Sequence, residues 1–224
     1  YGKLNVAVIE VTAILEDGSL VPSTAVGNNK TWLDLADKVI LEVNSYQSMH
    51  LQGMHDIYYG TQIPPKRQPI QMTQSDARIG EPFLRVDPAK VVAVVETHAS
   101  DRNTDFTPPD QDSELIAAHL IDFFQHEVKQ GRLPNNLLPL QSGVGNIANA
   151  VLAGLNKSSF ENMTAYTEVL QDGMLDMIAS GKLRHASATA ISLSKTGLQY
   201  FEDNLEQLRE RILLRPQEIS NHPE

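Results

Sequence analysis

A glycine turn and a carboxylate are the groups of this chain whose types and spacing could do chemistry together. Gly143-Val144-Gly145 separates a short apolar run from the apolar stretch 146–155, and Glu168 closes the next extended stretch at 163–167. Such a turn presents backbone N–H groups at the start of a helix, where a negative oxygen is stabilised. A carboxylate is ionised at neutral pH and attacks an acyl carbon without a general base. Because the chain has no cysteine and no obvious serine elbow, Glu168 is the strongest nucleophile candidate.

Simpler interpretations exist for both features. Glycines between a strand and a helix mostly serve backbone geometry, and a glutamate at a strand end is mostly a solvated carboxylate. The turn also departs from the dinucleotide fingerprint G-x-G-x-x-G, because Ala148 occupies the third glycine position. Glu168 could still be taken for the acidic residue that binds a ribose. A nucleotide-binding turn therefore stays open beside a catalytic one.

The elements that must position these groups alternate between strands and helices, which predicts an α/β fold. From Asp112 onward the predicted order is α-β-α-β-α-β-α, and the glycine turn follows the first of these strands. In a parallel sheet the turn and Glu168 would share the edge at which open α/β sheets bind ligands. The predicted helices cover residues 112–131, 146–155, 173–180 and 198–212, and the predicted strands cover 137–140, 163–167 and 185–193.

The first half of the chain predicts a second α/β unit. An Asp17-Gly18 turn joins two strands, a short helix covers 32–37, and residues 45–87 are rich in turn formers. The stretch 90–96 predicts a buried strand because valine dominates it. The Asp-, Asn- and Pro-rich segment 100–111 is the best domain boundary, which divides the chain into domains 1–108 and 109–224. Further strands are predicted at residues 4–11, 20–21 and 38–44.

Composition excludes several classes of function. The 224 residues carry a formal net charge of −10, which argues against a nucleic-acid partner. No apolar run approaches the roughly 18 to 20 residues that a membrane helix needs, so we expect no membrane span and a cytoplasmic location. His50, His55 and Asp56 could be drawn as a metal site, but no histidine pair at helical spacing has an acidic third ligand, so we expect no metal. The chain begins at Tyr1, and we expect it to be a piece of a longer polypeptide.

Three stretches carry a resemblance to a known family. Residues 141–151, which include the glycine turn, residues 166–173 around Glu168, and Ile219-Ser220-Asn221 closely resemble the acetyl-CoA hydrolase/transferase family. This family comprises class I CoA-transferases, among them succinyl-CoA:acetate CoA-transferase. The resemblance implies two open-sheet α/β domains of the CoA-transferase type. The second domain, and on one interpretation also the first, would be incomplete in this chain.

The resemblance also implies roles for individual residues. Glu168 would be the nucleophile, passing through an acyl-glutamyl anhydride and a glutamyl-CoA thioester. The backbone N–H of Val144 would be half of an oxyanion hole, and Asn221 would lie near the thioester. The residues that would contact coenzyme A are Gly143, Val144, Gly145, Asn146 and Ile147.

The implied substrates are an acyl-CoA and a small carboxylic acid of the acetate or succinate type, with coenzyme A as a substrate and no metal. Hydrolysis of acetyl-CoA, with water as acceptor, and a non-catalytic nucleotide-binding module stay as alternatives. The family's later Gly-Gly-Ser-Gly-Asp-Phe segment does not occur in this chain, so the piece alone could fold and yet be inactive. A homodimer is one assembly open to it, although residue spacing does not decide the oligomeric state.

Overall fold

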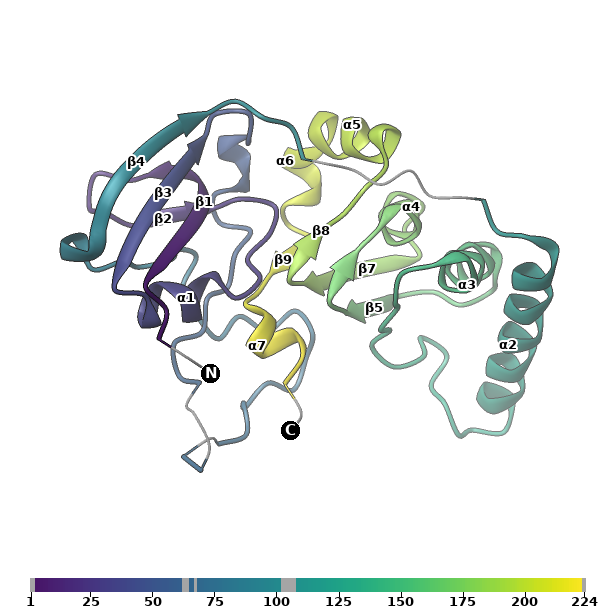
Figure 1. Ribbon diagram of the computed structural model, residues 1–224. Coiled ribbons are helices and arrows are strands. Elements are labelled where there is room, and N and C mark those ends of the chain that lie inside the picture. Colours follow the sequence, from purple (N-terminus) through teal and green to yellow (C-terminus); the bar gives the residue numbers. More distant parts are fainter. Residues whose placement is uncertain (1–2, 62–64, 67, 102–107, 223–224) are drawn as a thin grey trace.

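The computed structural model describes residues 3–61, 65–66, 68–101 and 108–222, and it has two open sheet regions side by side (Figure 1). The first half of the chain forms the larger sheet. The second half forms the smaller sheets and most of the helices, with α2 farthest from the first sheet. The α/β class predicted from the sequence is confirmed.

The first sheet has the strand order β2-β1-β3-β4. β1 pairs antiparallel with β2 and parallel with β3, and β3 pairs parallel with β4. The helix α1 (Asn29–Leu35) lies in the crossover from β2 to β3. The predicted hairpin, helix and strands of this half are thus confirmed. The strands are β1 (Val6–Ile14), β2 (Leu20–Pro22), β3 (Lys38–Asn44) and β4 (Val91–Thr97).

The prediction that residues 90–96 form a buried strand is wrong in its burial. The strand exists as β4, but it lies at the edge of the sheet, and the side chains of Val92 and Val94 are 55% and 54% exposed. On β1, which is separated from β4 by β3, Val8 is also 59% exposed. Valine favours extended backbone whether or not its side chain is covered, so composition predicted the strand correctly and its environment incorrectly.

The second half contains a three-stranded parallel sheet in the order β5-β7-β9 and a two-stranded parallel ribbon of β6 and β8. The predicted strand at 185–193 is therefore divided between two sheets. The ribbon reaches the first half through a bridge between Ala190 and Ala25. The strands are β5 (Met163–Tyr166), β6 (Val169–Leu170), β7 (Leu183–Ala188), β8 (Ala190–Ile191) and β9 (Ile212–Leu214).

Helices pack in succession outward from β7. The helix α4 (Asp172–Ala179) lies against β7, α3 (Asn146–Lys157) packs on α4, and α2 (Gln111–Lys129) packs on the outer side of α3 (Figure 1). Gly173 allows the close approach of α3 and α4, because a Cβ there would lie 3.0 Å from the Cβ of Leu152. The two 3₁₀ helices of the first half are η1 (Met49–Leu51) and η2 (Pro88–Lys90).

Two predicted elements are wrong. The stretch 137–140 is not a strand, because Leu137 has a φ of +56° and Pro139 has no N–H to donate; only Leu140 pairs, in parallel, with Ala165. The predicted long helix at 198–212 is broken at Asn204, whose φ of −117° is not helical. The chain there forms α5 (Lys195–Asp203), α6 (Leu205–Leu208) and then strand β9.

The two halves share one continuous core and meet at the end of β9. The N–H of Leu214 donates to the carbonyl of Met54 at 2.8 Å, and the N–H of Asp56 donates to the carbonyl of Leu214 at 2.9 Å. Buried apolar side chains from both sheets belong to the same cluster, among them Ile9 of β1 and Ala186 of β7. The predicted boundary between domains 1–108 and 109–224 stays a prediction, since the shared core neither places nor excludes it.

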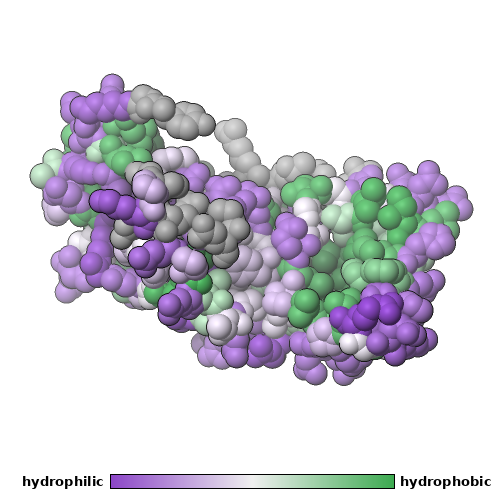
Figure 2. Space-filling view, turned by 90° about the horizontal axis from the view of Figure 1, so that it is seen from below, coloured by the Kyte–Doolittle hydropathy of each residue, from purple (hydrophilic) through white to green (hydrophobic). Residues whose placement is uncertain are grey.

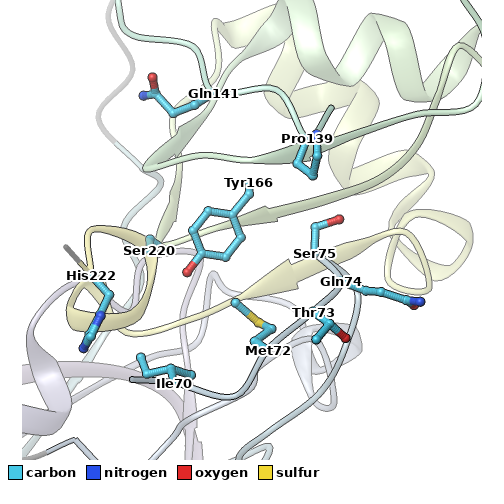
Figure 3. Close-up of a pocket in the computed structure, with 10 residues that line it drawn as sticks. All are labelled: Ile70, Met72, Thr73, Gln74, Ser75, Pro139, Gln141, Tyr166, Ser220 and His222. Atoms are coloured by element: carbon cyan, nitrogen blue, oxygen red, sulfur yellow. The ribbon is translucent and has the colours of Figure 1, made fainter. Parts of the chain in front are cut away.

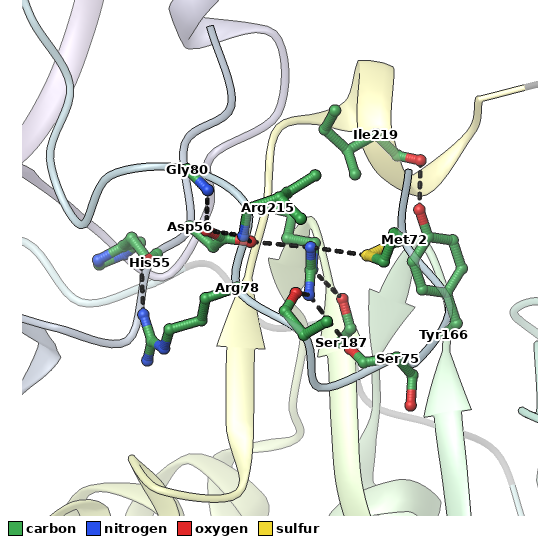
Figure 4. Close-up of polar contacts among 12 residues, drawn as sticks. His55, Asp56, Met72, Ser75, Arg78, Gly80, Tyr166, Ser187, Arg215 and Ile219 are labelled. Atoms are coloured by element: carbon green, nitrogen blue, oxygen red, sulfur yellow. Dashed lines mark hydrogen bonds and ion pairs between the residues drawn. The ribbon is translucent and has the colours of Figure 1, made fainter. Parts of the chain in front are cut away.

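An ion pair lies buried at this junction (Figure 4). Nη1 of Arg215 lies 2.8 Å from Oδ2 of Asp56, and the two side chains are 0% and 1% exposed. The guanidinium also donates to Ser187 Oγ at 2.8 Å and to the carbonyl of Ala77 at 2.6 Å. Asp56 accepts from the N–H of Gly80 at 2.6 Å. Burial lowers the pKa of Arg215 and the charge of Asp56 opposes that shift, so the charges stay paired.

Removal of one partner of the buried ion pair should lower the stability of the protein. Arg215→Met is expected to reduce the free energy of unfolding by roughly 3 to 5 kcal/mol, because Asp56 is left buried without its counter-ion. Urea denaturation followed by circular dichroism measures the loss. The matched control is Arg184→Met, which breaks a 3.2 Å pair with Asp76 at a side chain that is 58% exposed and should change the stability by about 1 kcal/mol or less. Equal effects of the two substitutions would contradict this account.

Candidate active site

The segment before the glycine turn runs alongside β5. The N–H of Leu140 donates to the carbonyl of Thr164, and the N–H of Tyr166 donates back to the carbonyl of Leu140, both at 2.8 Å. Thr167 Oγ1 then donates to the carbonyl of Ser142 at 3.1 Å. These contacts hold the turn next to the carboxyl end of β5. The predicted shared edge is therefore present for the turn and the strand that precedes Glu168.

The turn requires glycine at one position. Gly145 has φ +136° and ψ 174°, a conformation that is essentially restricted to glycine, and it is the N-cap of α3. No side chain of the described residues caps the first turn of α3, so its N–H groups are free to receive a negative oxygen. Val144 is 68% exposed and Ile147 is 50% exposed. Figure 2 shows apolar side chains gathered on the half of the molecule that carries α2 and α3.

Glu168 is held through both its backbone and its side chain. Its carbonyl accepts from the N–H of Thr189 at 2.8 Å and of Ala190 at 3.3 Å, which fixes it between β5 and β6. Its half-buried carboxylate accepts, at Oε1, a hydrogen bond of 2.9 Å from Nε2 of Gln217. Gln217 opens the helix α7 (Gln217–Ser220). One amide therefore orients the predicted nucleophile.

Asn221 follows at the C-cap of α7. It is exposed, and its N–H donates to the carbonyl of Gln217 at 2.9 Å, so it lies one helical turn after the residue that contacts Glu168. Asn221 was predicted only through the family resemblance, and Gln217 was not predicted from the sequence. No local signal could have found Gln217, because its partner Glu168 is 49 positions away in the chain.

A cavity of about 450 Å³ opens beside these segments (Figure 3). Tyr166 of β5 stands in the middle of its lining, and its hydroxyl donates to the carbonyl of Ile219 in α7. Burial raises the pKa of Tyr166, and the positive charge of Arg215 opposes the shift, so the phenol is a neutral donor. The cavity is mixed in polarity and is lined by Ile70, Met72, Thr73, Gln74, Ser75, Pro139, Gln141, Tyr166, Ser220 and His222.

Metal ligands do not gather in the part of the chain that the structure describes: no group of three His, Asp or Glu side chains could hold an ion there. His55 lies in the core with its pKa lowered to about 4 by burial, and its Nε2 lies 2.9 Å from the carbonyl of Ser23. A membrane-crossing helix, long and apolar enough for the task, is likewise not found among the described residues.

Fold and site together define an open α/β protein in which a carboxylate and a glycine turn at a helix N-terminus lie near one sheet edge. The model of the acetyl-CoA hydrolase/transferase N-terminal domain matches residues 1–96. Acetyl-CoA hydrolases of Yarrowia lipolytica and Candida albicans are 49% and 50% identical over 222 residues, which is 99% of this chain and 42% of each relative. The succinyl-CoA:acetate CoA-transferase of Clostridium kluyveri is 46% identical over 99% of this chain and 41% of that protein. Residues 1–96 thus match the N-terminal domain of the acetyl-CoA hydrolase/transferase family, and nearly the whole chain is similar to proteins named acetyl-CoA hydrolase and succinyl-CoA:acetate CoA-transferase.

Solved structures support the fold. RipA from Yersinia pestis aligns with a TM-score of 0.65 at 18% identity, over 98% of this chain and 42% of that one. The 4-hydroxybutyrate CoA-transferase of Porphyromonas gingivalis aligns with a TM-score of 0.63 at 20% identity, over 98% of this chain and 46% of that one. The chain thus spans about two fifths of the length of the curated relatives it matches.

The geometry of the turn can be tested on stability alone. Gly145→Ala is expected to reduce the free energy of unfolding by about 1 to 3 kcal/mol, because an L-residue is strained at φ +136° even though a Cβ would meet no atom within 4 Å. Gly143→Ala is the matched control, since a Cβ there also meets no atom within 4 Å and its φ is not positive. Urea denaturation measures the free energy of unfolding of both variants. Equal stability of Gly145→Ala and Gly143→Ala would contradict the conformation described for the turn.

Proposed function

We propose that the protein containing this chain is a CoA-transferase that moves coenzyme A between an acyl-CoA and a small carboxylic acid of the acetate or succinate type. The observation that carries the proposal is the carboxylate of Glu168, held by a single amide at the sheet edge that also carries the Gly143–Gly145 turn. The names of the relatives support the same class of substrate. Coenzyme A is a substrate in this proposal, and no metal is needed.

The first half-reaction begins at the acyl carbon. An oxygen of Glu168 attacks the thioester carbonyl of the acyl-CoA, and the carbonyl oxygen becomes an oxyanion. The N–H of Val144 donates to that oxyanion; one such donor contributes roughly 10² to 10³ in rate. The C–S bond then breaks, CoA thiolate departs, and an acyl-glutamyl anhydride remains.

The second half-reaction occurs at the glutamyl carbon. CoA thiolate attacks the carboxyl carbon of Glu168, the bond to the bridging oxygen breaks, and the first acid leaves as a carboxylate. The product is a glutamyl-CoA thioester, with Asn221 nearby at the end of α7. A second carboxylate attacks this thioester and reverses the sequence, which yields the new acyl-CoA and free Glu168.

Binding of coenzyme A at the turn fits the surface found there. Val144 and Ile147 expose apolar side chains beside the free N–H groups of α3, and Gly143, Gly145 and Asn146 complete the segment. Contacts to the distant part of coenzyme A would offset the unfavourable anhydride, since remote binding energy can stabilise a reactive intermediate. We also propose that the site lies between the domains 1–108 and 109–224, because Gly27 and Gln217 meet beside Glu168.

A covalent adduct tests the role of Glu168. Incubation of the full-length protein with acetyl-CoA should leave a CoA thioester on Glu168, detectable by mass spectrometry of a protease digest. Glu168→Gln should abolish the adduct and lower the turnover on the order of 10⁴-fold or more. Glu161→Gln, at an exposed carboxylate on the same half of the chain, is the control; this variant should form the adduct and turn over at the wild-type rate. Full ligand binding with unchanged function in Glu168→Gln would instead favour a non-catalytic nucleotide-binding module.

Hydrolysis is the second candidate, because several relatives carry the name acetyl-CoA hydrolase. In that case water takes the acyl or glutamyl group. Release of free CoA from acetyl-CoA should be measured with a thiol reagent, with and without succinate. A transferase is expected to release little CoA alone and to form succinyl-CoA when the acid is present. Acceptor-independent release at a rate comparable to transfer would favour the hydrolase.

A further inference from the structure

Gln217 is the one side chain, among the described residues, that donates a hydrogen bond to the carboxylate of Glu168. The bond goes to Oε1 at 2.9 Å. No described group donates to Oε2, so that oxygen keeps its lone pairs available for attack. The two carboxylate oxygens of Glu168 are therefore distinguishable before any substrate binds.

The amide of Gln217 is itself oriented from the first half of the chain. Asn28 Nδ2 donates to Oε1 of Gln217 at 3.2 Å, which turns the amide nitrogen of Gln217 toward Glu168. The backbone N–H of Gln217 donates to the carbonyl of Gly27 at 2.8 Å. Gly27 has a φ of +49°, in the left-handed region that favours glycine. A relay from Asn28 through Gln217 to Glu168 therefore crosses between the two halves.

Contacts on other sides hold the helix that carries Gln217. α7 has only four residues, too few to be stable alone. Tyr166 donates to the carbonyl of Ile219, and Thr31 Oγ1 donates to Oε1 of Glu218 at 3.0 Å. Lys30 Nζ lies 3.9 Å from the same carboxylate oxygen. These contacts fix Gln217 relative to β5, the strand that ends two residues before Glu168.

The relay has a chemical consequence that rests on the proposed function. When Oε2 attacks the acyl carbon, Oε2 becomes the bridging oxygen of the anhydride and Oε1 becomes the glutamyl carbonyl oxygen. When thiolate attacks the glutamyl carbon, Oε1 takes the electron pair of the C=O bond, and Oε2 leaves with the first acid as the tetrahedral centre collapses. Oε1 therefore stays bonded to the glutamyl carbon and carries the negative charge in this step.

We infer that Gln217 positions Glu168. The Gln217 amide selects Oε2 of Glu168 as the attacking oxygen, and it donates to Oε1 when that atom becomes the oxyanion of the glutamyl step. The N–H of Val144 would donate to the oxyanion formed at the acyl carbon, and the amide of Gln217 would donate to the oxyanion formed at the glutamyl carbon. Asn28 would act through Gln217 by keeping its amide nitrogen turned toward Glu168.

Rapid mixing of the full-length protein with acetyl-CoA, followed by acid quench and mass spectrometry, measures how fast the CoA adduct forms on Glu168. Gln217→Met keeps the size of the side chain and removes the donor. We expect it to slow adduct formation and kcat by roughly 10- to 100-fold with little change in the KM for acetyl-CoA. Asn28→Ala should give a smaller loss of the same kind, because the donor remains but is less well oriented.

Gln199→Met is the matched control, since Gln199 is an exposed glutamine of α5 that donates to Asp203 at 3.0 Å. It should form the adduct at the wild-type rate. Thermal unfolding of each variant checks the fold, and the final amount of adduct gives a second check. A folded Gln217→Met variant should reach the wild-type amount slowly, whereas an unfolded one would never reach it.

The outcomes separate this inference from the proposed function. If the wild-type protein forms no adduct on Glu168, the proposed function fails. If the wild type forms the adduct and a folded Gln217→Met variant forms it equally fast, only the inference about Gln217 is overturned. A change confined to KM would also overturn it. If Gln217→Met fails to fold, a wild-type rate in the folded Asn28→Ala variant overturns the relay.

Discussion

The buried ion pair between Arg215 and Asp56 fixes the point at which the two sheets meet. Arg215 follows β9 directly, and Asp56 lies in the loop whose backbone pairs with Leu214. A buried pair is tolerated only when its remaining hydrogen-bonding groups are satisfied, and here backbone groups of the segment around Ala77 and Gly80 supply them. The helix α7 begins two residues after Arg215. The position of Gln217, and so the orientation of Glu168, depends on this junction.

The two parts of the candidate site differ in what holds them. The glycine turn depends on local contacts: the conformation of Gly145 and the hydrogen bonds that align Leu140 and Ser142 with β5. The carboxylate depends on a contact that spans the chain, because Gln217 is held in turn by Gly27 and Asn28. Disturbance of the junction between the halves should therefore affect the carboxylate before it affects the turn.

This difference explains how much could be predicted from the sequence. The glycine turn and the helix α3 were predictable because two glycines followed by an apolar helical stretch leave a local pattern of residue types, whereas the role of Glu168 stays a prediction. The role of Gln217 was not predictable, because it depends on contacts with Glu168, Gly27 and Asn28, which are all distant from Gln217 in the sequence. The failures among the elements have the same origin: Leu137 adopts a positive φ, and residues 212–214 join β7 as a strand although their spacing continued a helical pattern. The exposure of Val92 and Val94 shows that valine content predicts extended backbone but does not predict what covers it.

Transfer and hydrolysis would share the nucleophile and the covalent intermediate in the proposed mechanism. Glu168, the turn and Gln217 act on the acyl and glutamyl carbons whichever acceptor follows, so these residues cannot by themselves choose between water and a carboxylate. The choice must depend on which molecule reaches the glutamyl thioester. A carboxylate brings its own negative charge and needs a neutral or positive environment, whereas water needs a base to remove its proton. Gln217, the hydrogen-bond partner of the Glu168 carboxylate, is a neutral amide and cannot serve as that base.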